Sequence, residues 1–124
     1  MKVAIPLFMD RISPRYDFAP TLSLFTIKRE RVVERREISC EGWNDMERVS
    51  RLRELGVDTV ICGGLPNHLL SLLTHNGIKA IPWVAGDANE ALTLFLQDKL
   101  SSRMTLCPGR GSRRRFCRGR GRLT

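Results

Sequence analysis

Residues 57–73, VDTVICGGLPNHLLSLL, form the stretch that decides the fold. The run opens with four residues, 59–62, whose apolar character and β-branching predict a strand buried on both faces. Gly63 and Gly64 end this strand, and a helix with regularly spaced leucines follows. In an open α/β sheet, ligands bind in the crevice at the carboxyl end of such a strand. The glycine amides could hold an anion there, although a glycine pair can also simply make the turn from strand to helix.

The remaining apolar patterns predict further strands at residues 1–6, 21–28, 31–38 and 78–84, and further helices at 45–55 and 88–100. Only Arg29 and Glu30 separate the second and third strands, so these two should pair as an antiparallel hairpin. With right-handed crossovers, the chain should form an α/β fold whose five-stranded mixed sheet has the order 3-2-1-4-5. The second strand should be antiparallel and helices should cover both faces. This is the strand order of ribonuclease H-like three-layer domains.

Charge divides the chain into two parts. Residues 1–102 carry thirteen Lys or Arg and thirteen Asp or Glu, whereas residues 103–124 carry eight Arg and no acidic residue. The formal net charge of +8 therefore lies entirely in the tail. We expect one domain over residues 1–102 and a disordered Arg/Gly-rich tail over 103–124, because the tail has little apolar surface to bury. Such a tail can bind nucleic acid weakly and nonspecifically through charge, so a nucleic-acid-binding protein is the alternative function.

Nothing in the sequence indicates a membrane. No apolar run approaches the roughly 20 residues that a membrane-spanning helix requires. The start, MKVAIPLFMD, lacks the pattern of a signal peptide. We therefore expect a cytoplasmic protein with reduced cysteines.

The residues that could perform catalysis are few. A two-metal nuclease requires a cluster of carboxylates at the strand ends, and Cys62 stands where an acidic residue would be needed. Cys62 and His68 could act as nucleophile and base, but a free cysteine more often lies in the core. We therefore expect a protein that is not an enzyme.

Metal binding by cysteine is the next possibility. The four cysteines, Cys40, Cys62, Cys107 and Cys117, show no CxxC spacing of a zinc or ferredoxin-type site. Cys107 and Cys117 in the tail could supply soft ligands for iron, copper or an iron–sulfur cluster, or could remain free thiols. His68, in the first turn after the glycines, is a candidate ligand or hydrogen-bond donor.

Five short segments of the chain form a recognisable set: MKVAIP at residues 1–6, SPRYDFAP at 13–20, VDTVICGG at 57–64, NGIK at 76–79 and GDANEAL at 86–92. Together they resemble the dinitrogenase iron–molybdenum cofactor biosynthesis family. In the family's loop, Ser-Pro-x-Phe-Gly-Arg-Ala, Ser13 and Pro14 match, Arg15 occupies a position that is often histidine, and Tyr16 replaces phenylalanine. The resemblance covers residues 1–100 and implies a ribonuclease H-like fold without nuclease residues. It also implies binding or carrying of a metal–sulfur cluster, such as a precursor of the iron–molybdenum cofactor.

We therefore expect a carrier for an anionic metal–sulfur cluster or a related small anionic ligand, which would exchange it with donor or acceptor proteins. The site should lie between residues 7–20, 63–68 and 85–86, at the carboxyl edge of the parallel strands. The residues expected to contact the cofactor are Ser13, Arg15, Tyr16, Cys62, Gly63, Gly64, His68 and Gly86. The candidate metal ligands are Cys62, His68, Cys107 and Cys117.

Overall fold

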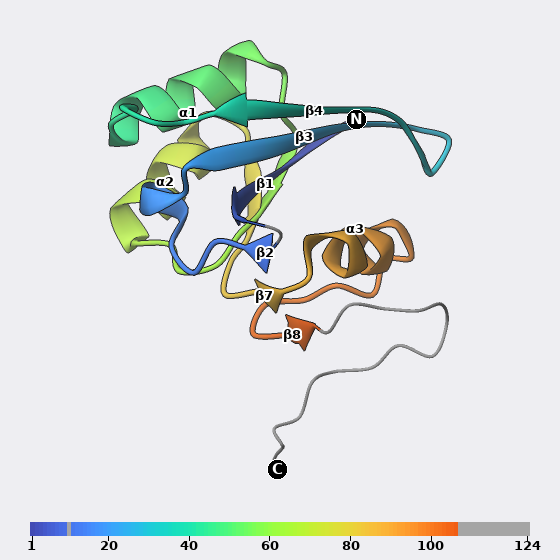
Figure 1. Ribbon diagram of the computed structural model, residues 1–124. Helices are drawn as coiled ribbons and strands as arrows, with labels where there is room; N and C mark the ends of the chain where they lie inside the picture. Colours follow the sequence, from blue (N-terminus) through green and yellow to red (C-terminus); the bar gives the residue numbers. More distant parts are fainter. Residues whose placement is uncertain (10, 107–124) are drawn as a thin grey trace.

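A central mixed sheet organises the computed structural model, which describes residues 1–9 and 11–106 of the chain (Figure 1). The principal strands are β1 (Lys2–Phe8), β3 (Thr21–Lys28), β4 (Arg31–Ser39), β5 (Thr59–Ile61) and β6 (Lys79–Ile81). They lie in the order β4-β3-β1-β5-β6. β3 is antiparallel to both β1 and β4, whereas β1, β5 and β6 are parallel. The predicted strand order and the antiparallel second strand are confirmed.

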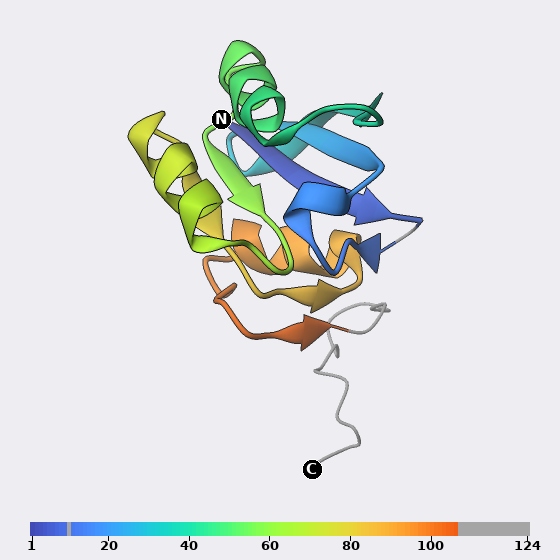
Figure 2. The same cartoon turned by 90° about the vertical axis from the view of Figure 1, so that its left-hand side faces the viewer.

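Helices cover both faces of the sheet, as expected (Figures 1 and 2). α1 (Asp45–Glu54) and α2 (Asn67–His75) pack on one face, and α3 (Ala88–Leu96) packs on the other. Val60 faces the first of the two resulting cores and Ile61 the second, and both side chains are fully buried. The short strand β5 is therefore buried on both faces, which explains its continuous apolar run. None of the helices described is long and apolar enough to cross a membrane.

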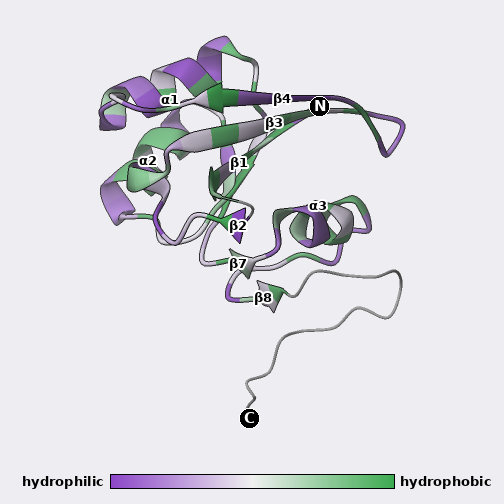
Figure 3. Cartoon of the chain, in the orientation of Figure 1, coloured by the Kyte–Doolittle hydropathy of each residue, from purple (hydrophilic) through white to green (hydrophobic). Residues whose placement is uncertain are grey.

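The start of α1 is fixed by a capping box. The Asn44 side chain accepts a hydrogen bond from the Glu47 amide at 2.8 Å, and the Glu47 side chain accepts one from the Asn44 amide at 3.3 Å. These bonds satisfy backbone donors that the helix cannot satisfy itself. α1 is the most hydrophilic of the three helices (Figure 3). Its position thus depends on this cap and on a narrow apolar stripe.

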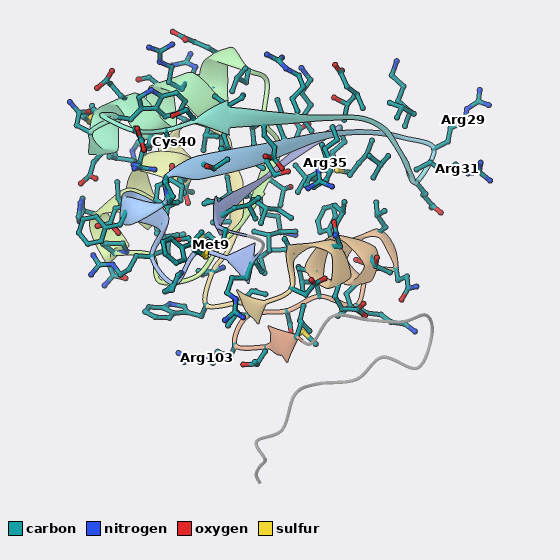
Figure 4. All side chains as sticks on the ribbon, in the orientation of Figure 1. Met9, Arg29, Arg31, Arg35, Cys40 and Arg103 are labelled. Carbon is teal, nitrogen blue, oxygen red and sulfur yellow. The ribbon has the colours of Figure 1, made fainter. Side chains whose placement is uncertain are left out.

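β3 and β4 form the predicted hairpin. Lys28 pairs with Arg31, so only Arg29 and Glu30 form the loop. Both loop residues have positive φ, 52° and 62°, as a type I′ turn requires. Figure 4 shows Arg29 and Arg31 at the far tip of the hairpin, whereas Cys40 lies beyond its other end, near the start of α1.

Four short elements were not predicted: β2 (Arg11–Ile12), the 3-10 helix η1 (Tyr16–Phe18), β7 (Ala85–Gly86) and β8 (Thr105–Leu106). β8 pairs in parallel with β7, and Leu106 is buried in the core under α3. The folded unit thus extends past the boundary that was expected at residue 102. In addition, α3 ends at Leu96 and not at residue 100, because the chain turns back there toward β8.

Candidate functional site

The segment between β2 and β3 crosses the carboxyl end of β5 and pairs with it. The Tyr16 amide donates to the Gly64 carbonyl at 2.9 Å, and the Gly64 amide donates to the Pro14 carbonyl at 2.6 Å. Arg15 and Gly64 form an isolated parallel bridge in this pairing. The structure therefore brings the predicted loop and the predicted glycines together.

Gly63 and Gly64 permit this pairing because they have no Cβ atom. A Cβ atom on Gly63 would clash with the Ser13 carbonyl oxygen and would lie 2.8 Å from that of Pro14. Both glycines are buried, and the Gly64 amide already has an acceptor. The expectation that the two amides point outward to an anion is therefore corrected for Gly64. The close backbone approach that the glycines permit is made by the protein's own loop.

Ser13 and Tyr16 also face inward. The Ser13 hydroxyl donates to the Arg15 carbonyl at 2.9 Å and is 3% exposed. Tyr16 is 2% exposed and belongs to the core under α1 and α2. Burial raises the pKa of the Tyr16 hydroxyl, which has no hydrogen-bond partner in the structure. Both side chains are therefore buried and hold the loop in place.

Arg15 lies at the surface, but its guanidinium already forms an ion pair with Asp17. Its guanidinium donates two hydrogen bonds to Asp17, from Nε at 3.0 Å and from Nη2 at 2.8 Å. It also lies over the Phe18 ring, 4.7 Å from the ring centroid. Arg15 therefore attracts an anion less than an isolated arginine would.

His68 and Gly86 lie in different surroundings. His68 is exposed on the first turn of α2, where its Nε2 lies 3.3 Å from Asp45 Oδ2 on α1. Gly86 belongs to β7, with φ of +102°, and a Cβ atom there would clash with the Leu106 backbone. Gly86 thus permits the pairing of β7 with β8, and its contact with a cofactor stays a prediction.

Cys62 is fully buried, so its thiol does not reach a ligand in this structure. Burial raises its pKa from 9.0 to about 12. Because the unprotonated thiol is the form that binds metals, both exposure and protonation disfavour Cys62 as a ligand. The contact between Cys62 and a cofactor stays a prediction, which the burial of its thiol does not favour.

The raised pKa of Cys62 leads to a stability prediction. A thiol whose folded pKa is above its unfolded value stabilises the fold fully below pH 9 and loses that contribution as the pH rises toward 12. Between these pH values, the free energy of unfolding of the wild type should fall more steeply than that of Cys62→Ala, by up to about 1.4 kcal/mol per pH unit. Urea denaturation at a series of pH values measures this difference. Parallel pH profiles above pH 9 would contradict it.

Two predicted ligands, Cys107 and Cys117, lie outside the described residues, as does most of the Arg-rich tail. Within residues 1–9 and 11–106, no three His, Cys, Asp or Glu side chains form a group suited to a metal ion. The described part of the chain therefore provides no complete set of protein ligands for a metal ion.

An open groove of about 690 Å³ lies beside the loop, between η1 and the start of α1. Residues 17–20 form one wall, residues 40–46 form the other, and Arg48 completes the lining. Phe18 and Met46 are largely exposed, 70% and 61%, and Trp43 is half-buried. The groove therefore combines an apolar rim with one cation, Arg48, and three carboxylates, Asp17, Glu41 and Asp45.

Arg48 is 8% exposed. Its Nη1 donates to the Tyr16 carbonyl at 3.4 Å, and its Nε has no hydrogen-bond partner in the structure. Burial raises the pKa of the neighbouring Cys40 thiol, and Arg48 opposes that rise by its charge and a hydrogen bond. Cys40 is 2% exposed at the groove wall.

The groove was not predicted from the sequence, because an arginine in an amphipathic helix is expected on its solvated face and a methionine on its buried face. The structure reverses both positions. The available signal was helical spacing: Arg48 lies one turn before the buried Leu52 and next to the buried Val49, so it shares their inward face.

Comparison with known proteins completes the description of the site. The sequence profile of the family described as dinitrogenase iron-molybdenum cofactor matches residues 1–98. The protein PH0822 has a similar crystal structure, with a TM-score of 0.77 and 19% sequence identity over 82% of this chain and 94% of that one. The apo form of the orange protein from Desulfovibrio gigas gives a TM-score of 0.69 and 14% identity over 82% and 91% of the two chains. At these identities the likeness shows a shared fold. No curated protein sequence matches significantly.

Proposed function

The chain belongs to the dinitrogenase iron-molybdenum cofactor family, and from that premise we propose that it binds and carries an anionic metal–sulfur cluster as its cargo. In this proposal the protein holds the cluster without transforming it, in the cytoplasm, and passes it between donor and acceptor proteins. The observation that carries the proposal is the position of the family's loop. Residues 13–20, which resemble the family's Ser-Pro motif, end in the wall of the groove beside α1.

The chemistry of the groove suits a cluster that brings its own ligands. The described residues hold no group of three metal-binding side chains, so the groove would not build a cluster from bare ions. Beside the carboxylates of Asp17, Glu41 and Asp45, it offers the Arg48 guanidinium and an apolar rim that includes a thioether and aromatic rings. The guanidinium and the rim fit a preassembled anion with a sulfide surface, since sulfur and soft metals favour thioether and aromatic neighbours.

A tryptophan titration tests this location. The chain has two tryptophans, Trp43 in the groove and Trp83 outside it. Trp83→Phe leaves Trp43 as the reporter, and Trp43→Phe leaves Trp83. The probe is tetrathiomolybdate, a small anion in which sulfide ligands surround molybdenum, added without oxygen.

We expect saturable quenching of Trp43 at one probe per chain and weaker quenching of Trp83. Quenching that never saturates, or that equals the quenching of free tryptophan, would contradict binding. Saturable quenching that is stronger for Trp83 would contradict the groove as the site.

A further inference from the structure

The charge of Arg48 is unusual for a side chain buried this deeply. The ion pairs of the described residues are Arg15 with Asp17 and Arg35 with Glu37, and His68 forms one with Asp45 only when its imidazole is protonated. Within residues 1–9 and 11–106, Arg48 therefore has no carboxylate partner. Burying a cation without a counter-charge is costly, and a buried ion of this kind is weak evidence for a stabilising role.

The contacts of Arg48 with the protein are few. Nη1 donates a long hydrogen bond of 3.4 Å to the Tyr16 carbonyl, the guanidinium also hydrogen-bonds the Cys40 thiol, and Nε has no partner among the described residues. Of the two carboxylates that line the groove near it, Asp17 is paired with Arg15, and Asp45 lies 3.3 Å from His68 and forms no ion pair with Arg48. The guanidinium thus retains its charge and an N–H donor, at Nε, that the described residues do not use.

We infer that Arg48 recognises the negative charge of the ligand, so that the groove binds a small anion with sulfido or oxo groups at this residue. The inference rests on the proposed function and names the residue that selects its cargo. A guanidinium forms charge-assisted hydrogen bonds to such an anion, and these are stronger at a site shielded from water. The apolar rim of Phe18 and Met46 would provide that shielding around a bound anion.

The third acidic residue of the groove predicts in which direction a second substitution changes the affinity for an anion. Glu41 lines the groove, and no ion pair of the described residues involves it. Its negative charge opposes an anion bound beside Arg48. Removing that charge should therefore strengthen anion binding, whereas removing the charge of Arg48 should weaken it.

Titration of the full chain with tetrathiomolybdate, followed by calorimetry, tests the inference. Arg48→Met should weaken binding about tenfold or more, because a charge-assisted hydrogen bond is lost. Arg48→Lys should give an intermediate loss, since the ammonium retains the charge without the planar fork. Glu41→Gln should bind more tightly than the wild type. The matched control is Arg53→Met, an exposed arginine of the same helix outside the groove, which should bind as the wild type does.

Thermal unfolding separates recognition from a structural role. The melting temperature of Arg48→Met without ligand should lie within about 5 °C of the wild type, because methionine replaces a buried, unpaired charge with an apolar side chain of similar length. The probe should raise the melting temperature of the wild type and not that of Arg48→Met.

The outcomes distinguish the two proposals. If the wild type binds the probe and Arg48→Met binds it equally well, the inference about Arg48 is overturned while the carrier function stands. If the wild type shows no saturable binding, the proposed function itself fails. Should Arg48→Met not fold, Arg48→Lys and Glu41→Gln decide the matter, and affinities unchanged in both would overturn the inference.

Discussion

Gly63→Ala should destabilise the protein by about 3 kcal/mol, at the upper end of the cost of overpacking a well-packed site. A Cβ atom at this position would clash with the Ser13 carbonyl oxygen and lie 2.8 Å from that of Pro14, both of which are backbone atoms. The loop must therefore move away from β5, and the hydrogen bonds of Gly64 with Pro14 and Tyr16 must lengthen or break. Urea denaturation followed by circular dichroism measures the loss.

Gly77→Ala is the matched control. Gly77 has φ of +76°, but a Cβ atom there would meet nothing within 4 Å. Its substitution should cost only the strain of a left-handed alanine, about 1 kcal/mol. Equal losses for the two variants would mean that the loop does not depend on the close approach at Gly63.

Tyr16→Ala should cost about 3–5 kcal/mol, the range for removing a buried aromatic side chain. Tyr16 is 2% exposed, packs in the core under α1 and α2, and carries the carbonyl that accepts from Arg48. Tyr16→Phe keeps the ring and removes a hydroxyl that has no hydrogen-bond partner in the structure, so this variant should be as stable as the wild type or more stable.

Denaturant midpoints of the two Tyr16 variants check this prediction. A loss of stability in Tyr16→Phe comparable to that in Tyr16→Ala would show that the hydroxyl, and not the ring, fixes the loop.

The sheet could be predicted because its determinants are local and periodic. The two-residue separation at Arg29 and Glu30 indicates the hairpin, and the apolar run at β5 indicates a central parallel strand. β7 and β8 have no such signal. Each is only two residues long, and they pair because Gly86 lets the backbone of Leu106 approach, which a short sequence pattern does not reveal.

The candidate site could be predicted only in part, for a related reason. Gly63 and Gly64 were correctly placed beside the loop, but sequence alone does not distinguish a glycine that accommodates a ligand from one that accommodates the chain itself. Arg48 was missed because a charged residue on a helix is usually solvated. Its burial depends on the loop at Tyr16 closing over it, which is a tertiary contact.

The central claim is that residues of the folded domain, and not the tail, carry a metal–sulfur cluster. The most direct measurement is the molybdenum and acid-labile sulfide content of the full chain after anaerobic incubation with tetrathiomolybdate, a preassembled molybdenum–sulfur anion, and removal of the unbound excess. It should be compared with a variant carrying both Cys107→Ser and Cys117→Ser. The account predicts stoichiometric metal and sulfide, in equal amounts in the two proteins. Metal retained only by the protein with both tail cysteines, or by neither protein, would contradict it.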